Sequence, residues 1–373
     1  MTDVCVLSTV HPAHDQRIYH KEIRALADAG YDVTFVVHAG ESGVRDGVRI
    51  RSLGTTDSRG DRWRHVRDAY RIARDLDADC YHFHDPELLP VGAALARNTA
   101  GRVIYDVHEY YPDAIYMREW IPFPIRLPLA RAFPPIESGF VRRLDAVITA
   151  DDPTSRAFRA RGHDPVLTLR NFPKTESIEV GDPPLERRHR HVLAYVGQLS
   201  RERGLFRMLD IVSLLPETEL WAVGGFKNRA VEREARAVVA RRGLSDRVTF
   251  TGYVEYDRLF SYLAGADCGL ALLDRRRTRR NVPTKLFEYL ACGLPVVATA
   301  GESVVRYLDQ ETGVFVPEAD PETAADRVRA LLANGERRAE MGRTGRERVA
   351  AKYSWERERE RLLGLYESLV GSP

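Results

Sequence analysis

Short apolar runs and longer amphipathic stretches alternate along the whole chain. In the first half, runs rich in β-branched and aromatic residues predict strands at residues 3–10, 32–37, 48–52, 80–84, 102–107 and 146–150. Between them, helical periodicity predicts helices at 20–29, 63–76, 86–97 and 153–161. Because strands and helices alternate, the pattern indicates βα units and a parallel sheet.

The second half restarts this pattern after a break. Strands are predicted at 191–196, 219–223, 248–251, 268–272, 296–298 and 313–316, and helices at 204–215, 230–242, 256–264 and 321–334. The break, 170–190, has prolines and many charges but no periodicity, which is typical of a linker. We therefore predict an α/β fold of two doubly wound, Rossmann-like domains, 1–172 and 189–353, facing across a cleft, with a last helical segment, 354–373, that joins the first domain.

Length and composition narrow the class of protein. A chain of 373 residues exceeds what one hydrophobic core usually supports. The net charge of +2, from 56 basic and 54 acidic residues, argues against a dedicated nucleic-acid binder. The four cysteines are scattered without a CxxC pair, which indicates buried thiols in a reducing compartment. The start lacks a signal-peptide pattern and no apolar run has transmembrane length, so we expect a cytoplasmic protein.

The segment 281–298 carries the most specific chemistry. Asn281 is the predicted N-cap of a helix that has Pro283 in its first turn and ends at Gly293, before a buried strand. Lys285 and Glu288 are three residues apart and project from one face near the helix start. Free amides and Lys285 suit a phosphate, and Glu288 could accept ribose hydroxyls, so the pair fits a sugar nucleotide. A surface lysine–glutamate pair on an ordinary helix is the alternative.

Glycine turns follow three successive strands of the second half. Gly197 permits close approach of a ligand to the backbone, and Arg203, at the start of the next helix, can point at a diphosphate. A salt bridge at the helix start is the alternative for Arg203. Gly224 and Gly252 end the next two strands, and the shared position of these turns at one sheet edge favours a binding site.

A polar stretch, 11–17, follows the first strand, where a ligand loop is expected. It lacks the GxGxxG fingerprint, which disfavours a nicotinamide oxidoreductase. His11 could contact a hydroxyl and Arg17 an anionic group. A polar turn with a helix cap at Asp15 is the alternative.

Two further strands end in histidines and acids, at 82–87 and 106–109. Buried polar groups need partners, and a hydrophobic core does not require them. Such strand ends therefore indicate a functional site. His108 is the best candidate for a residue beside a reacting carbon. His82 and His84 point to one face, but a third metal ligand would have to come from elsewhere. We therefore favour hydrogen bonding and predict no metal site.

Two exposed stretches suggest contacts with larger partners. Residues 275–280 contain five arginines in six positions, most simply a solvated loop, with a phosphate-bearing acceptor or an anionic membrane surface as a second hypothesis. Residues 120–133 are apolar, aromatic and basic but are interrupted by prolines. They could rest on a lipid interface or cover an acceptor pocket, and packing within the first domain is the alternative.

Together these elements resemble family 4 of the nucleotide-sugar glycosyltransferases, the group 1 transferases, which have the GT-B architecture. The residues that carry the likeness are His11-Pro12, Gly30 to Val33, the strand end at 106–109, the loop 197–204 and Pro283 to Tyr289. The likeness covers nearly the whole chain, and the last of these segments is the most specific.

The resemblance implies a metal-independent, retaining transferase with an acceptor-binding N-terminal domain and a nucleotide-sugar-binding C-terminal domain. Glu288 would bind the donor ribose, Lys285 and Arg203 would hold the diphosphate, and His108 would lie near the transferred sugar. We accordingly predict catalytic roles for His108, Arg203 and Lys285; donor binding by Gly197, Gln198, Arg203, Gly224, Lys285, Leu286 and Glu288; and acceptor or cleft contacts from His11, Arg17, His84, Asp85 and Glu109.

The chain departs from the family pattern at two positions. The family often carries two glutamates eight residues apart, but Arg280 stands eight residues before Glu288. Gln198 stands where an arginine is common. These departures imply a changed contact to the sugar.

We expect the protein to move a hexose-type sugar from a nucleoside-diphosphate donor to a growing glycan, free or lipid-linked, with peripheral contact to the inner face of the membrane and no nucleic-acid partner. Two alternatives stay open. One is a nucleotide-sugar epimerase on the same architecture. The other is a non-catalytic subunit that pairs with an active transferase, suggested by Arg280.

Overall fold

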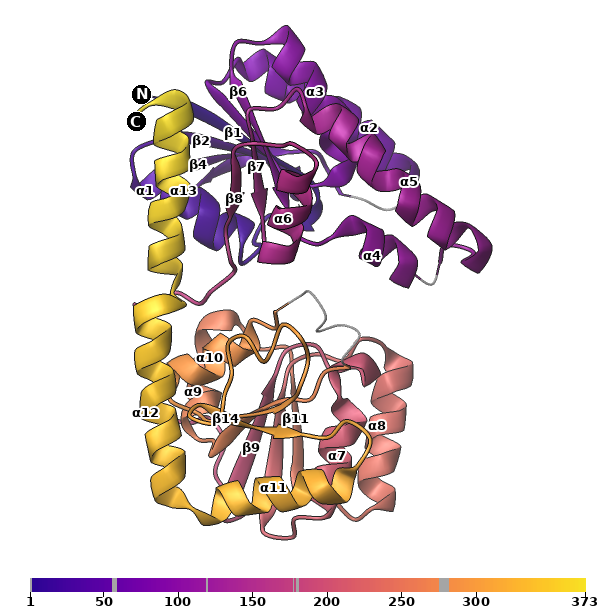
Figure 1. Ribbon diagram of the computed structural model, residues 1–373, viewed down its shortest axis with the longest axis vertical. Coiled ribbons are helices and arrows are strands. Elements are labelled where there is room, and N and C mark those ends of the chain that lie inside the picture. Colours follow the sequence, from indigo (N-terminus) through magenta and orange to yellow (C-terminus); the bar gives the residue numbers. More distant parts are fainter. Residues whose placement is uncertain (1, 56–58, 119, 177, 179–180, 275–281) are drawn as a thin grey trace. The chain divides into compact units, whose positions relative to one another are not determined.

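The computed structural model describes residues 2–55, 59–118, 120–176, 178, 181–274 and 282–373. The chain divides into two compact units (Figure 1): an N-terminal unit of Met1–Asn171 with Arg357–Pro373, and a C-terminal unit of Phe172–Glu356. The described residues between 172 and 190, which we predicted as a linker, lie in neither helix nor strand.

The N-terminal unit is built on an eight-stranded sheet. Its strands are β1 (Asp3–Pro12), β2 (Asp32–His38), β3 (Gly43–Arg45), β4 (Val48–Ser52), β5 (Cys80–Phe83), β6 (Arg102–Val107), β7 (Ala146–Thr149) and β8 (Val166–Thr168). They lie in the order β3-β4-β2-β1-β5-β6-β7-β8, and all pairs are parallel except β3 with β4. The six predicted strands are confirmed. The two that were missed, β3 and β8, have three residues each, too few to show a period.

The helices of this unit differ more from the prediction. They are η1 (Ile18–Ile23), α1 (Arg24–Asp28), α2 (Arg59–Leu76), η2 (Pro86–Leu88), α3 (Leu89–Asn98), α4 (Tyr111–Met117), α5 (Phe123–Val141) and α6 (Asp152–Ala160). The first predicted helix is a π-helix followed by a short α-helix. Helix α5 was missed because prolines disfavour helix interiors, yet Pro128, Pro134 and Pro135 lie inside it. Burial of its other face, including Ala130 and Val141, overrides the local preference.

The C-terminal unit has a six-stranded, all-parallel sheet. Its strands are β9 (His191–Val196), β10 (Thr218–Val223), β11 (Val248–Gly252), β12 (Cys268–Ala271), β13 (Val296–Thr299) and β14 (Gly313–Val316), in the order β11-β10-β9-β12-β13-β14. All six predicted strands are confirmed. They are nearly continuous apolar runs, because helices cover both faces of such a sheet.

The helices of this unit are η3 (Arg201–Arg203), α7 (Leu205–Ser213), α8 (Arg229–Arg241), α9 (Tyr256–Ala264), α10 (Lys285–Ala291), α11 (Pro321–Ala333) and α12 (Gly335–Lys352). In α7, Leu205, Met208, Leu209 and Val212 recur at helical spacing and are buried. Helix α12 was not predicted because half of its residues are charged and few are apolar. Its buried residues include Gly342 and Gly345, which give no apolar signal but permit close packing against α10.

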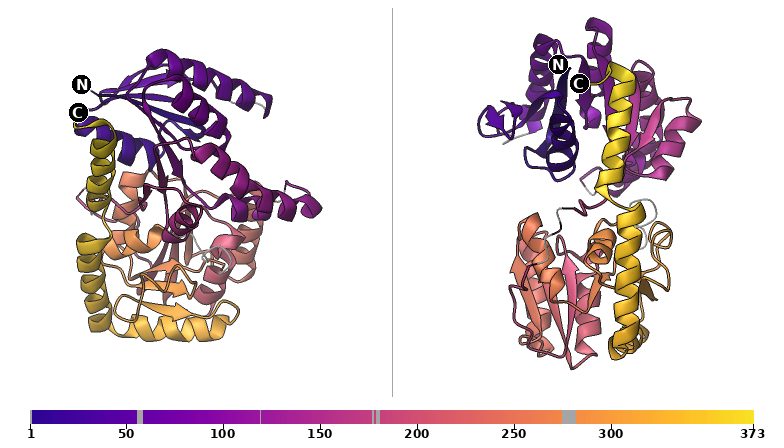
Figure 2. Two further views of the ribbon diagram at one scale, coloured as in Figure 1. Left: turned by 45° about the horizontal axis from the view of Figure 1, so that its top comes forward. Right: turned by 90° about the vertical axis from the view of Figure 1, so that its left-hand side faces the viewer.

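The last helix, α13 (Trp355–Val370), supplies most of its residues to the N-terminal unit. There Tyr366 is fully buried, and its hydroxyl lies 2.9 Å from Nδ1 of His82. The two ends of the described chain lie side by side in this unit (Figure 2), and Pro373 lies against Gly30. Among the helices described, none has the length and apolar character needed to cross a membrane.

In each sheet the chain adds strands first on one side of a central strand and then on the other side. β1 lies between β2 and β5, and β9 lies between β10 and β12. In open parallel sheets ligands bind beyond the carboxyl ends of strands at such points. The ends of β1 and β9 are therefore the places to look for a site.

Candidate functional site

At the carboxyl end of β9 the glycine turns of neighbouring strands touch one another. The amide of Gly197 donates a 2.9 Å hydrogen bond to the carbonyl of Val223. Gly224 has φ +144°, and a Cβ atom added to it would lie 2.1 Å from the carbonyl oxygen of Gly197. Gly224 also forms a bridge to Gly252. Glycine is required at Gly224 because any side chain would collide with the adjacent backbone.

Two cationic side chains converge on this turn. Measured from the position that a Cβ atom on Gly197 would take, Nη1 of Arg203 lies 3.4 Å away and Nζ of Lys285 lies 3.5 Å away. Lys285 is 5% exposed, and its Nζ has no hydrogen-bond partner among the described residues. It lies 3.7 Å from the centroid of the Tyr195 ring. The structure therefore brings together two of the three predicted catalytic residues at a glycine backbone.

The electrostatic setting of Lys285 is unusual. Burial, and then the charge of Arg203, lower the pKa of Lys285 well below its ordinary value, and Glu288 opposes this only in part. An amine held in this way is stabilised in its charged form by any anion that comes to lie between the two cations. Perturbed groups of this kind cluster at functional sites.

The start of α10 differs from the prediction. The helix begins at Lys285 with Thr284 at its N-cap, three residues later than predicted, and Asn281 lies outside the described residues. The amides of Leu286 and Phe287 donate to the carbonyls of Pro283 and Thr284, so these two are not free for a phosphate. At seven residues α10 is short, and the cationic side chains rather than the helix dipole define the site.

The remaining donor-site candidates vary in accessibility. Glu288 is 8% exposed, and after burial itself it is the largest cause that raises the pKa of Tyr256. Gln198 is exposed, and its carbonyl accepts a 2.9 Å hydrogen bond from the hydroxyl of Tyr195. The side chain of Leu286 is completely buried in the apolar core, so a ligand could meet only its backbone.

At the end of β1 in the N-terminal unit, Asp85 fixes the backbone. Its Oδ2 accepts hydrogen bonds from Oγ of Ser8 at 2.8 Å, from the amide of Thr9 at 2.6 Å and from the amide of Val10 at 3.1 Å. Its Oδ1 lies 3.6 Å from Nε2 of His11. Asp85 therefore has a structural role that the sequence did not reveal, and its other oxygen faces His11.

His11 lies between two carboxylates. Its Nδ1 is 3.4 Å from Oδ2 of Asp15, and its Nε2 faces Asp85. Burial alone would lower the pKa of His11, but these carboxylates outweigh burial and raise it. Asp15 also accepts hydrogen bonds from the amides of Arg17 and Ile18, although the N-cap of the helix that follows is Arg17 and not Asp15 as predicted.

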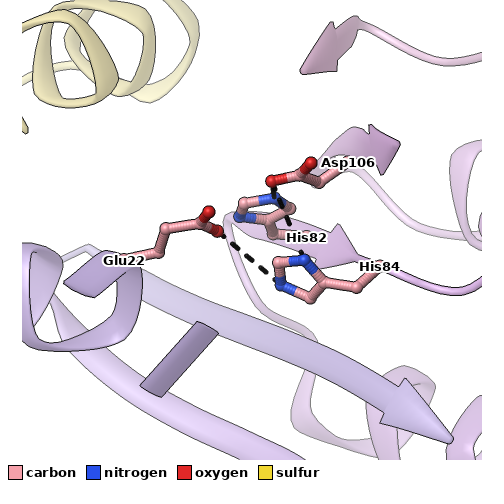
Figure 3. Close-up of side chains that lie close together, drawn as sticks. All are labelled: Glu22, His82, His84 and Asp106. Carbon is pink, nitrogen blue, oxygen red and sulfur yellow. Dashed lines mark ion pairs between the residues drawn. The ribbon is translucent and has the colours of Figure 1, made fainter. Parts of the chain in front are cut away.

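Near residues 11–17 lie four buried side chains that we call the histidine–carboxylate cluster: Glu22, His82, His84 and Asp106 (Figure 3). Arg17 holds it together, because its Nε donates to Oε1 of Glu22 at 2.8 Å and its Nη2 donates to both oxygens of Asp106 at 3.0 Å. We expected Arg17 to meet an anionic ligand. Instead it is 6% exposed and meets two carboxylates of its own unit.

The two carboxyl groups of the cluster, those of Asp106 and Glu22, have pKa values shifted in opposite directions. Burial would raise the pKa of Asp106, but the Arg17 guanidinium and the neighbouring histidines together outweigh it and hold this pKa well below its usual range. Burial and the charge of Asp106 raise the pKa of Glu22 well above its usual range. Arg17 thus keeps Asp106 ionised, whereas the carboxyl of Glu22 favours its protonated form.

His108, the predicted residue beside the reacting carbon, lies at the edge of the cluster. Its Nε2 is 3.1 Å from Nδ1 of His84, and its ring centroid is 4.7 Å from that of His11. Burial, partly opposed by Asp106, lowers the pKa of His108 to about 3, so the imidazole is neutral at ordinary pH. Glu109 lies apart from this group, 40% exposed and 3.6 Å from Arg118.

A pocket of about 440 Å³ opens beside His11 at the ends of β1, β2 and β4. Its lining residues are Thr9, Val10, His11, Pro12, His38, Ala39, Gly40, Gly54 and Thr55. His38 was not predicted as a site residue, and its place after a buried strand was the only available signal. Arg280 and the rest of the arginine run, 275–280, lie outside the described residues.

Solved structures share this fold over the full chain. Sucrose-phosphate synthase from Thermosynechococcus elongatus matches with a TM-score of 0.77 and 20% identity, covering 99% of both chains. Anabaena Alr3699/HepE in complex with UDP-glucose matches with a TM-score of 0.74 and 13% identity over 99% of this chain and all of that one. WaaG, a glycosyltransferase of lipopolysaccharide biosynthesis, matches with a TM-score of 0.68 and 16% identity over 99% of this chain and all of that one.

Sequence comparisons agree with these folds. The model for "Glycosyl transferases group 1" matches residues 190–334, and the "Glycosyl transferase 4-like domain" matches residues 17–171. The lipopolysaccharide core mannosyltransferase LpsB of Rhizobium meliloti is 26% identical over 69% of this chain and 76% of that protein. A GDP-mannose-dependent phosphatidylinositol monomannoside mannosyltransferase of Corynebacterium glutamicum is 30% identical, but over only 43% of this chain and 42% of that protein.

Two Rossmann-like units with parallel sheets, matched end to end by these structures, define the GT-B fold. Because the two family models lie in succession on the two units, the chain belongs to the group 1 glycosyltransferases.

Proposed function

We propose that the protein transfers a sugar from a nucleoside-diphosphate donor to a glycan or lipid-linked glycan, with retention of anomeric configuration. The observation that carries this proposal is the convergence of Arg203 and Lys285 on the backbone of Gly197. When the sugar departs, negative charge develops on the diphosphate. Cations fixed beside that charge in a low-dielectric site stabilise the transition state more than the ground state.

The protein's own cations fit the role that a metal has in other transferases. Lys285 and Arg203 lie close enough to raise each other's electrostatic energy, and a diphosphate between them would relieve it. We therefore propose that no metal bridges the donor diphosphate. Glu288, one turn further along α10, is the proposed partner of the ribose hydroxyls.

The N-terminal unit is the proposed acceptor side. The pocket beside His11 lies at the strand ends where ligands bind in such sheets. His108 adjoins His11, and as a neutral imidazole it can donate or accept a hydrogen bond at a sugar hydroxyl.

Helices α4 and α5 support a proposed peripheral membrane contact. Several of their apolar side chains are exposed, among them Met117 at 49%, Phe123 at 72% and Ile125 at 52%. The exposed Arg118 and Arg131 accompany them. Apolar side chains among cations suit the anionic surface of the inner leaflet, where the lipid-linked acceptor would lie.

The donor is tested by thermal unfolding with diphosphates and diphosphate sugars of uridine, guanosine and adenosine. Relatives point to two of these bases, since HepE binds UDP-glucose and the Corynebacterium relative depends on GDP-mannose. A ligand that binds the native state raises the melting temperature by mass action. If none of them does so, the proposed donor site is wrong.

The role of the cations is tested in a transfer assay. Removing the charge at Lys285 or Arg203 with alanine should cost roughly 2–4 kcal/mol of transition-state stabilisation. Lys352→Ala, which changes an exposed lysine of α12, is the matched control. Unchanged turnover in both site variants would contradict the proposal. Conversion of the donor to an isomer without acceptor would favour an epimerase, and failure to hydrolyse any bound donor would favour a non-catalytic subunit.

A further inference from the structure

The histidine–carboxylate cluster contains polar atoms that the rest of the unit leaves without partners. Oε2 of Glu22, Nε2 of His82 and Nε2 of His84 make no hydrogen bond with any described residue. The three side chains are at most 1% exposed, so bulk water does not reach them. Buried polar atoms are nearly always satisfied, because each unsatisfied one costs about 1–3 kcal/mol. Three of them in one place call for an occupant.

These atoms face other side chains of the cluster (Figure 3). Nε2 of His84 is 4.0 Å from Oε2 of Glu22, and Nε2 of His82 is 3.8 Å from Oδ2 of Asp106. One donor atom from each of the four side chains lies within 4.8 Å of all the others. Metal–ligand distances of about 2.0–2.2 Å place tetrahedral ligand atoms about 3.3–3.6 Å apart, so an inward movement of the side chains by about 1 Å or less suffices.

In Glu22, His82 and His84 the other polar atom is already held from outside the cluster, and Arg17 holds both oxygens of Asp106. Oε1 of Glu22 accepts from Arg17, and Nδ1 of His82 pairs with the Tyr366 hydroxyl. Nδ1 of His84 is 3.1 Å from Nε2 of His108. Metal-binding histidines and carboxylates are oriented in this way, by partners on the atom that does not bind the metal.

The charge of the cluster also suits a cation. Two carboxyl groups, those of Glu22 and Asp106, face one guanidinium, that of Arg17, so both could be ionised beside a bound divalent cation. Two imidazoles with two carboxylates form a ligand set that Zn²⁺ accepts in tetrahedral geometry.

We propose that the histidine–carboxylate cluster of the N-terminal unit binds a single divalent cation of the zinc type. The cation joins η1, β5 and β6 and, through Tyr366, the last helix α13. It is a structural site of this unit. The cation site is independent of the proposed transferase activity, in which Lys285 and Arg203 bind the donor diphosphate.

The test begins with the wild-type chain stripped of metal by a chelator. Titration with Co²⁺ should end at a single bound cation and give the intense visible absorption of a tetrahedral centre. X-ray absorption of the Zn²⁺-loaded protein should show nitrogen and oxygen ligands with two imidazoles and no sulfur. Zn²⁺ should also raise the melting temperature. A wild-type chain that binds neither ion, because water fills the cluster, overturns the proposal whatever the variants do.

Variants then locate the cation. His82→Gln and His84→Gln should each abolish the absorption of bound Co²⁺. His163→Gln should keep it, since His163 is also a buried histidine of this unit but contacts Ser138 instead. Circular dichroism before titration identifies variants that fail to fold. Loss of the absorption in His163→Gln as well, its persistence in folded cluster variants, or sulfur ligands in the wild-type spectrum would each refute the assignment.

Discussion

The two strand-end regions hold their cations differently. In the N-terminal unit, Arg17 is bonded to both Glu22 and Asp106 and has little exposure. In the C-terminal unit, Lys285 approaches another cation, Arg203, and its Nζ lacks any hydrogen-bond partner among the residues described. A buried cation with two carboxylates serves the fold. Burial without a hydrogen-bond partner disfavours the charged form of an amine. A lysine in such a place is better explained by binding of an anionic ligand.

Arg17→Ala should give the largest effect on stability. It leaves Asp106 as an uncompensated buried carboxylate and removes the hydrogen bond to Glu22, and breaking a buried pair in this way costs about 3–5 kcal/mol. Arg24→Ala, which removes the half-buried partner of the exposed Asp28 in the same segment, should cost less than about 1 kcal/mol. Urea unfolding of the N-terminal unit measures both. Similar small losses in the two variants would show that Arg17 is not structural.

Gly224→Ala should disturb the donor side. Its new Cβ would meet the carbonyl oxygen of Gly197 at 2.1 Å, and overpacking of this kind costs about 1–3 kcal/mol. Gly225→Ala is the control, because a Cβ at Gly225 meets nothing within 4 Å. Chemical unfolding and nucleoside-diphosphate titration should show losses in Gly224→Ala alone. Equal behaviour of the two variants would mean that the glycine turns do not form the site.

The pH dependence of diphosphate binding should report Lys285. Its pKa is lowered in the free protein, and a bound diphosphate would raise it. Between these two pKa values binding takes up a proton, so affinity falls as pH rises, by up to about tenfold per pH unit. Below the lowered pKa this dependence disappears. Lys285→Arg should bind with little pH dependence over the same range, because arginine stays protonated. Calorimetry in buffers of different ionisation enthalpy measures the proton uptake, and its absence would contradict the role of Lys285.

Lys285→Met should make the ligand-free protein more stable. The substitution removes a buried amine without a hydrogen-bond partner and keeps a similar length, which should gain about 1 kcal/mol. Lys352→Met, at an exposed position, should change stability little. Thermal unfolding without ligand provides the measurement. A loss of stability in Lys285→Met would show that the lysine serves the fold, as Arg17 does.

The sequence predicted the strands well because parallel strands are buried apolar runs, and local composition is enough to reveal them. The sequence also indicated Lys285, Glu288 and Arg203 as candidates for donor binding, because their spacing around glycine turns is a local pattern. The structure places Lys285 and Arg203 at one glycine. Their roles in donor binding stay predictions.

The features that the sequence did not reveal depend on contacts between residues that are distant in the chain. Arg17 bonds to Asp106, which is 89 positions away, and no local pattern reveals such a pair. Glu22 lies in a stretch that has the pattern of an ordinary surface helix, so its place in the cluster was missed. Leu286 had the right position in the motif, but its side chain belongs to the core. Helix α5 formed despite its prolines, because tertiary packing decided the outcome.

The position of Tyr366 affects how the protein is made. The first 171 residues leave the ribosome long before Tyr366, yet the buried hydroxyl beside His82 comes from that residue. The N-terminal unit therefore completes its interior only after the whole C-terminal unit has been synthesised. Until then its unfinished apolar surface is exposed to chaperones and to neighbouring nascent chains.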